Sequence, residues 1–348
     1  MMRDNHFDVT NTVNVADPAA VRGAVRRLLS ALYPDIDLAP LTRAFDVYVR
    51  IYSGTLPGYH GCDTWYHDAQ HPLDCALAMA RLIDGHERTA ARRERLGARR
   101  AQLGVICALF HDVGYIRRLD EKQYKNGAQL TLTHVARSGA FLGDFLRTVG
   151  YRREAPMVRQ LVHYTGYEMP LEQVRVRDAR DRRLGFLLAT ADLLAQMSDR
   201  AYPEKCRTFL YHEFEACGLA GAGLPDGPKP IYGSPDEMIR KTPEFVKRVF
   251  DERLDGYFEG AYHYLEAHFG GENLYLAEVR KHLDYVRDVI ERDAMNLLRR
   301  TPECINAHVL RRELGLSLAD ARPHAEIDEL PEQAPEAARL RRGAFLPL

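Results

Sequence analysis

The sequence lacks paired cysteines and long apolar runs, and both absences narrow the class of protein. Its six cysteines form no CxxC pair, and a chain of 348 residues can bury a core without disulfides. We therefore expect free thiols in a reducing, cytoplasmic environment. No stretch reaches the roughly 18 apolar residues that a membrane-spanning helix needs. The N-terminal segment also lacks the apolar core of a signal peptide, so we expect none.

An excess of charge of one sign is absent too. The formal net charge of -1 gives no overall field that would attract a polyanion, so nucleic acid is not favoured as a partner. With 46% hydrophobic and 28% charged residues, the composition is that of a globular protein rather than a disordered or fibrous one. A local patch could still bind nucleic acid, and a homo-oligomer stays open.

What the sequence does contain is helical periodicity along most of its length, with no strand-like alternation. We predict an all-α protein with an N-terminal arm over residues 1–17 and one helical domain over 18–300. Residues 301–348 are polar and contain several prolines, which indicates a weakly ordered tail. The most apolar segment, LGFLLATADLLA at 184–195, predicts a central helix that is buried on most sides.

The first group of chemical interest is a histidine pair followed by an aspartate. His67 and His71 are four residues apart, so a helix places both rings on one face, one turn apart. Asp74 follows on the same side, where its carboxylate can accept the second ring N–H of a ligating histidine. A lone histidine is more often an ordinary polar residue than a ligand. A metal site therefore depends on further ligands elsewhere in the chain.

A second group ends the apolar run VICALF at 105–110, where His111 and Asp112 follow directly. A charged, hydrogen-bonding pair at the end of a buried helix costs free energy unless something compensates. A divalent cation compensates both residues, and the carboxylate can bridge two cations. The alternative is a helix C-terminus whose dipole favours a histidine.

Three more candidates lie on later helices. His134 stands near the start of a helix expected over 132–149, and His163 near the end of one over 155–163. Asp192 lies in the middle of the most apolar segment, where an isolated carboxylate is costly unless it is paired or bound to a metal. We favour Asp192 over Asp199, which lies two turns further along the same face and nearer the helix end.

The order of these residues resembles the HD superfamily of metal-dependent phosphohydrolases. The resemblance covers residues 60–200 and depends on His71, His111, Asp112, His134, His163 and Asp192. The segment YHDAQHPLD at 66–74 also resembles the first motif of class I cyclic-nucleotide phosphodiesterases, Y-H-N-x-x-H-x-x-D, with Asp68 in place of the asparagine. Ala191-Asp192-Leu193 is similar to the last metal-ligand motif of that family.

The resemblance implies an HD-like helical bundle with additional C-terminal helices and one or two divalent metal ions. It implies that the first ion is held by His71, His111, Asp112 and Asp192. Asp112 would also face the second ion, with His134 and His163 completing that site. His67 would be the general acid that protonates the leaving oxygen. Mixed His and Asp ligands suit Mn, Fe, Ni or Zn better than Mg, although affinity alone does not select the metal.

Other side chains near these ligands are candidates for contacts with the substrate: Tyr66, Tyr115, Arg117, Lys122, Lys125 and Gln196. The three basic residues follow the His-Asp pair closely, where they can reach a phosphate or form an ordinary solvated loop. Gln196 lies one turn past Asp192, so it can point into the site, but we favour a role in packing between helices.

The resemblance is incomplete where the substrate is concerned. The chain has Gly114 to Arg117 where the phosphodiesterases carry a further histidine, and 243–245 where a purine-binding glutamine is expected. The GYP signature of bacterial cyclic-dinucleotide hydrolases is also absent. A cyclic nucleotide is therefore only one candidate substrate.

The sequence thus predicts a phosphodiesterase or phosphomonoesterase that acts on a nucleotide-like small molecule. One alternative is an HD-type di-iron oxygenase that cleaves a carbon–carbon or carbon–phosphorus bond. Another is a non-catalytic domain that binds a nucleotide or a partner as a sensor. The presence of all six candidate ligands argues against a degenerate site.

Overall fold

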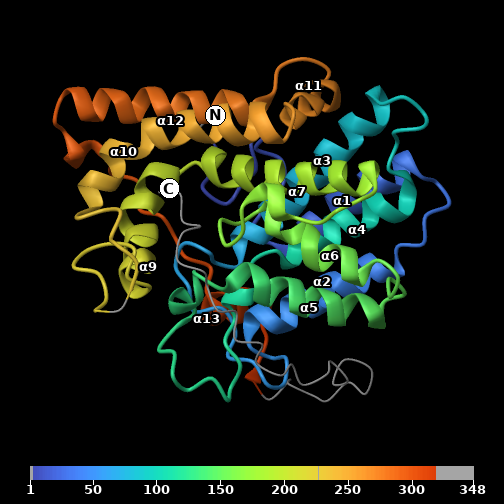
Figure 1. The fold of residues 1–348 in the computed structure, drawn as a ribbon, viewed down its shortest axis with the longest axis horizontal. Coiled ribbons are helices and arrows are strands. Elements are labelled where there is room, and N and C mark those ends of the chain that lie inside the picture. Colours follow the sequence, from blue (N-terminus) through green and yellow to red (C-terminus); the bar gives the residue numbers. More distant parts are fainter. Residues whose placement is uncertain (1–2, 226, 319–348) are drawn as a thin grey trace.

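A computed structural model describes residues 3–225 and 227–318 (Figure 1). Helices make up nearly all regular structure in this part of the chain, which contains no β-strand and only three isolated β-bridges. The all-α prediction is therefore confirmed. Within the same residues, no helix is both long enough and apolar enough to cross a membrane.

The N-terminal two thirds of the described chain form a bundle around two long buried helices, α3 and α7. Its helices are α1 (Pro18–Leu32), α2 (Ala39–Ser53), α3 (Gln70–Thr89), α4 (Gly97–Phe110), α5 (His134–Thr148), α6 (Ala155–Leu161) and α7 (Ala179–Ser198). Helix α3 packs against α1, α4 and α7, and α7 also packs against α4. Residues 184–195, expected to be the most buried segment, lie within α7, and all of them are buried.

Local sequence explains where several of these helices begin and end. Asp17 accepts a hydrogen bond from the backbone N–H of Ala19, with Pro18 in the first helical position of α1. Asp178 caps α7 in the same way through the N–H groups of Arg180 and Asp181.

The second part of the chain packs against more than one side of this bundle. It comprises α8 (Tyr202–Lys205), a π-helical segment (Cys206–Leu210), α9 (Tyr211–Ala216), α10 (Pro235–Arg248), a second π-helical segment (Val249–Tyr257), α11 (Tyr264–Phe269), α12 (Leu274–Glu291) and α13 (Ala307–Leu314). Helix α12 packs against α7, and α13 packs against α2. In Figure 1, α12 lies along the edge of the molecule next to α10 and α7, whereas α5 and α2 lie on the opposite side.

The prediction of a weakly ordered tail from residue 301 is wrong for residues 301–318, which include α13. The N–H of Ile305 donates to Asp68 Oδ2 at 2.8 Å, and the N–H of Ala69 donates to the carbonyl of Ile305 at 3.0 Å. Ala307 donates to the carbonyl of Cys62 at 2.8 Å. Backbone groups make these contacts, so the polar composition of the segment did not reveal them. Residues 319–348 of the predicted tail lie outside the described residues.

The predicted N-terminal arm has no helix over residues 3–17, as expected, but it is tied to the core. Asp8 forms an ion pair with Arg81 on α3, and both side chains are buried. Asp8 also accepts hydrogen bonds from the N–H groups of Thr10, Thr12 and Val13. The arm is thus organised around one buried carboxylate.

Candidate metal centre

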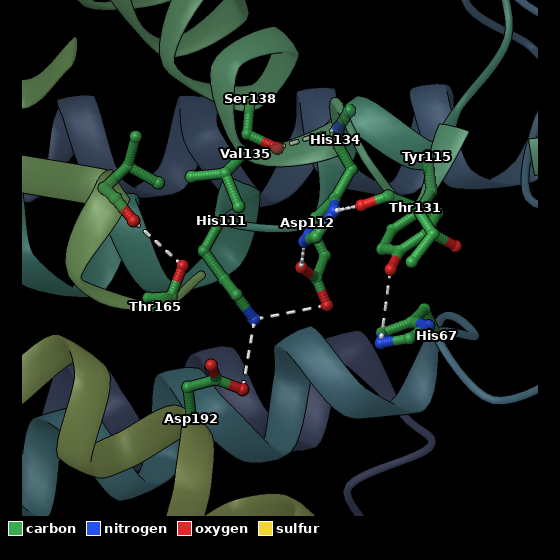
Figure 2. A network of polar contacts seen from close by, with 12 residues as sticks. His67, His111, Asp112, Tyr115, Thr131, His134, Val135, Ser138, Thr165 and Asp192 are labelled. Atoms are coloured by element: carbon green, nitrogen blue, oxygen red, sulfur yellow. Dashed lines mark hydrogen bonds and ion pairs between the residues drawn. The ribbon is translucent and has the colours of Figure 1, made fainter. Parts of the chain in front are cut away.

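Four of the predicted metal ligands come together where α3, α4 and α7 pack against one another. His71 lies in the first turn of α3, and Asp192 lies in the middle of α7. His111 follows the last residue of α4, and Asp112 begins the short turn after it. Figure 2 shows His111, Asp112 and Asp192 pointing toward one another from these elements.

The ligand atoms have the spacing expected around one ion. His71 Nε2 lies 3.1 Å from Asp192 Oδ1, 3.3 Å from His111 Nε2 and 3.5 Å from Asp112 Oδ2. His111 Nε2 lies 3.3 Å from Asp112 Oδ2 and 3.5 Å from Asp192 Oδ1. Ligands about 2.1 Å from a common metal lie roughly 3.0–3.4 Å apart in octahedral or tetrahedral geometry. The cluster is therefore close to the arrangement that a bound cation requires.

Hydrogen bonds outside the cluster orient its histidine rings. His111 Nδ1 donates to the carbonyl of Ala108 at 2.8 Å, and His134 Nδ1 donates to that of Thr131 at 2.6 Å. The proton on Nδ1 leaves the lone pair on Nε2, which is the atom that faces Asp112 in both rings. This is the arrangement that fixes a histidine for metal binding.

The electrostatics of the cluster show that it requires positive charge. Burial alone lowers the pKa of His111, but Asp112 and Asp192 outweigh burial and raise that pKa well above its usual value. Burial opposes ionisation of Asp192, yet His111 and His71 lower its pKa to about 2. The carboxylates thus remain charged and need either a proton on the histidines or a cation between them.

Asp112 faces two positions at once. Its Oδ2 belongs to the cluster with His71 and His111, whereas its Oδ1 lies 3.6 Å from His134 Nε2. Burial lowers the pKa of His134 to about 4, so this ring is a neutral donor near pH 7. Gly114 makes the approach of α5 feasible, because a Cβ there would lie 1.9 Å from the carbonyl oxygen of His134. This geometry suits a carboxylate that bridges two cations.

A buried glutamate on α9 orients His67, and no sequence motif pointed to it. Glu213 Oε2 lies 2.6 Å from His67 Nδ1, and Oε1 accepts the N–H groups of Trp65 and Tyr66 at 2.7 Å each. Burial lowers the pKa of His67, but Glu213 outweighs it and the pKa is raised. The other ring nitrogen, Nε2, lies 3.5 Å from the Tyr115 hydroxyl (Figure 2).

Three of the predicted substrate-contact residues lie in this site. The ring of Tyr115 stacks between His67 and His134, with centroid distances of 4.3 Å to each. The Tyr66 hydroxyl donates to Gln196 Oε1 at 3.3 Å, and Gln196 Nε2 donates to Asp192 Oδ1 at 3.3 Å. Of the two alternatives for Gln196, the structure therefore shows the one in which it points at the site.

The three basic candidates do not line the cavity. Arg117 is held by an ion pair with Asp63 at 2.5 Å and by the carbonyl of Tyr124 at 2.9 Å. Lys122 and Lys125 are exposed to solvent. Of the two alternatives for these residues, the described structure agrees with a solvated loop for Lys122 and Lys125. Contact of the three basic residues with a substrate phosphate stays a prediction.

Two further predictions find no support in the geometry. Asp74 does not support His71: Oδ1 is buried and has no hydrogen-bond partner within the described residues, and no hydrogen bond links the two side chains there. His163 Nδ1 is likewise buried without a hydrogen-bond partner in the described chain. Burial lowers the pKa of His163. Its role as a ligand stays a prediction.

A cavity extends from the cluster toward α9 and α10. Its polar half includes His67, Asp112, Tyr115, His134, Glu168, Asp192 and Gln196. Its other half is formed by apolar and aromatic side chains of residues 202–245, among them Leu210, Phe214, Leu219, Tyr232, Met238 and Phe245. Glu168 accepts hydrogen bonds from the N–H groups of Val135 and Ala136 at the start of α5, and burial raises its pKa to about 7.

No protein-family model matches the chain, and no curated protein matches it in sequence. The arguments that follow therefore depend on the geometry and chemistry of the site.

Proposed function

We propose that the protein is a divalent-metal-dependent phosphohydrolase of the HD type, acting on a small phosphate ester. The observation that supports this most is the spacing of the two histidine nitrogens, His71 Nε2 and His111 Nε2. They lie 3.3 Å from each other and 3.1–3.5 Å from one carboxylate oxygen each of Asp112 and Asp192. Beside them lies a histidine, His67, that does not belong to the cluster and whose free ring nitrogen faces the cavity. Cation binding and proton donation are thus assigned to different groups.

The residues present fit a divalent metal. Two imidazole nitrogens and two carboxylate oxygens form a mixed donor set that suits Mn, Fe, Ni or Zn. The lone pairs on the ring nitrogens face carboxylates, which is unfavourable unless a cation or a proton lies between them. Divalent ions bound here would neutralise phosphoryl oxygens and lower the pKa of a water molecule toward neutrality.

The chain's own residues supply the proton for the leaving group. Hydrolysis breaks the bond between phosphorus and the ester oxygen, and water adds to phosphorus. The departing oxygen needs a proton, which His67 Nε2 can donate because Glu213 holds Nδ1 and favours the protonated ring. Tyr115, stacked on His67, restricts the ring to one orientation.

The test is hydrolysis by metal-free protein after addition of Mn²⁺, Mg²⁺, Zn²⁺, Ni²⁺ or Fe²⁺. Substrates are a generic phosphodiester, a generic phosphomonoester and a nucleotide panel, with oxygen consumption measured in parallel for the iron form. We expect metal-dependent hydrolysis that falls by about a hundredfold or more in Asp112→Ala, because this change removes a ligand shared by both positions. Asp35→Ala, at an exposed position, is the matched control.

A folded protein that binds metal and hydrolyses none of these esters would contradict the proposal. Oxygen consumption by the iron form, with no hydrolysis, would favour the oxygenase alternative. Nucleotide binding without either reaction would favour the sensor.

A further inference from the structure

We infer that the substrate carries a single phosphoryl group on an apolar, ring-sized organic group, rather than on a nucleoside or a polyol. The inference rests on the proposed function for the phosphoryl end. The organic end is argued independently, from the half of the cavity that lies beyond the metal ligands.

The apolar half of the cavity is built by one part of the chain. Leu210, Phe214 and Leu219 line it from the region around α9, and Met238 and Phe245 line it from α10. Most of these side chains are hydrophobic, so the surface they offer favours an apolar group displaced from water. A substrate whose phosphoryl group lies at the ligand cluster would place its organic group here.

Several hydrogen-bond donors in the lining are already used within the protein. The hydroxyl groups of Thr131, Thr165 and Thr242 donate to backbone carbonyls at 2.7, 2.9 and 3.0 Å. The Tyr66 hydroxyl donates to Gln196, whose own amide donates to Asp192. A nucleobase edge or sugar hydroxyls buried here would give up hydrogen bonds to water and find few replacements, which is costly.

The charges around the cavity also limit the number of phosphates. No lysine or arginine is among its lining residues in the described chain. Arg253 does not line the cavity but contacts two residues that do. Its guanidinium lies 3.6 Å from the ring centroid of Tyr167 and donates a hydrogen bond to the carbonyl of Gly166. A second phosphate would meet the Glu168 carboxyl group and no cationic side chain, so polyphosphates are disfavoured.

These observations select an aromatic or similarly sized apolar phosphate ester. Its hydrolysis yields an apolar alcohol and inorganic phosphate, with the proton on the alcohol supplied by His67. Burial of one aromatic ring in the apolar half should strengthen binding by roughly 10- to 100-fold over a methyl-sized group.

The test separates the two halves of the cavity. Binding of 2-naphthol to the metal-free full chain reports on the apolar half alone. We compare the hydrolysis of 2-naphthyl phosphate by the metal-loaded chain with that of methyl phosphate, glycerol 2-phosphate, AMP, cyclic AMP and ADP. Phosphate release measures the reaction. We expect saturable 1:1 binding of 2-naphthol, and the lowest KM for the naphthyl ester.

Phe245→Ala and Leu210→Ala should each weaken 2-naphthol binding and raise KM for the naphthyl ester by about tenfold. They should leave metal content and KM for methyl phosphate within about twofold. Phe250→Ala is the matched control, since Phe250 is also half-buried but does not line the cavity. Phe245 and Leu210 are both half-buried, so either substitution could impair folding. Two separate variants are therefore used, so that the test does not depend on one of them folding.

The inference is overturned if AMP, cyclic AMP or ADP has a lower KM than the naphthyl ester. It is also overturned if 2-naphthol does not bind, or binds equally to the variants and to wild type. If 2-naphthol binds as expected but no ester is hydrolysed, the apolar subsite stands and the proposed hydrolase function fails.

Discussion

Asp74→Asn should stabilise the protein, which is the opposite of what a ligand-supporting aspartate would show. Asp74 is 8% exposed, and its Oδ1 has no hydrogen-bond partner within the described residues. Burial, together with the nearby Asp199 and Asp8 carboxylates, raises its pKa from 3.8 to about 7. At neutral pH the Asp74 carboxyl group of the folded chain is therefore about half ionised, in surroundings that disfavour its charge.

The magnitude follows from proton linkage. Between pH 3.8 and about 7 the folded chain holds a proton on Asp74 that the unfolded chain has released, so stability falls as pH rises. Each pH unit in this window removes about 1.4 kcal/mol of the free energy of unfolding. An asparagine at this position cannot titrate, so the advantage of Asp74→Asn over wild type should grow by about 2 kcal/mol between pH 5 and pH 7. It should then level off.

Urea unfolding followed by circular dichroism, with chelator present, measures this difference at several pH values. Asp84→Asn is the matched control on the same helix. Burial opposes ionisation of Asp84, but His268 and Arg88 outweigh burial and lower the pKa of Asp84. The ionised Asp84 therefore stabilises the fold at neutral pH, and this stabilisation is lost as the pH falls through the lowered pKa. This variant should therefore lose about 1–3 kcal/mol at pH 7. A pH-independent difference between wild type and Asp74→Asn would refute the reasoning.

Three further outcomes are expected. Glu213→Gln should lower kcat by about 10- to 100-fold at unchanged metal content. It should also move the alkaline limb of the pH profile of kcat to lower pH, because the carboxylate that raises the pKa of His67 is gone. An unchanged pH profile would contradict this. His134→Ala should lower the number of metal ions bound, measured by elemental analysis, because His134 Nε2 lies 3.6 Å from Asp112 Oδ1. His163→Ala should not lower it, because no ion pair links His163 to Asp112 within the described residues; equal loss in the two variants would contradict this. Asp68→Ala should weaken metal binding about tenfold in a competition titration, because Asp68 holds the loop before α3; unchanged affinity would contradict it.

The helical periodicity and the residues of the His/Asp cluster could be predicted from the sequence. The position of Asp192 inside α7 was predicted because a buried carboxylate in an apolar helix needs a partner. The pair His111 and Asp112 was predicted because it ends a buried helix. In both cases the signal is local: a polar residue stands where its neighbours in the chain predict an apolar one.

Contacts between distant segments could not be predicted in this way. Glu213 lies 146 residues from His67, and nothing around it marks it as different from an acid on a solvated helix face. Asp74 has the right spacing from His71 on the sequence, yet its side chain lies among Asp199, Asp8 and Arg81 instead. Arg117 follows the His-Asp pair closely, but Asp63 holds it away from the cavity. Spacing along the chain gives the face of a helix, whereas tertiary packing decides what lies against that face.

The loop over residues 65–71 shows how these distant contacts act on the site. It presents both His67 and His71, and buried carboxylates hold its backbone from two sides. Glu213 accepts the N–H groups at its start, and Asp68 accepts those of Gln70 and His71 at its end while also binding the N–H of Ile305. A carboxylate that accepts several backbone N–H groups fixes a loop more firmly than packing alone. The position of His67 relative to the His/Asp cluster therefore depends on residues from α9 and from the segment before α13, and not only on the first two hundred residues.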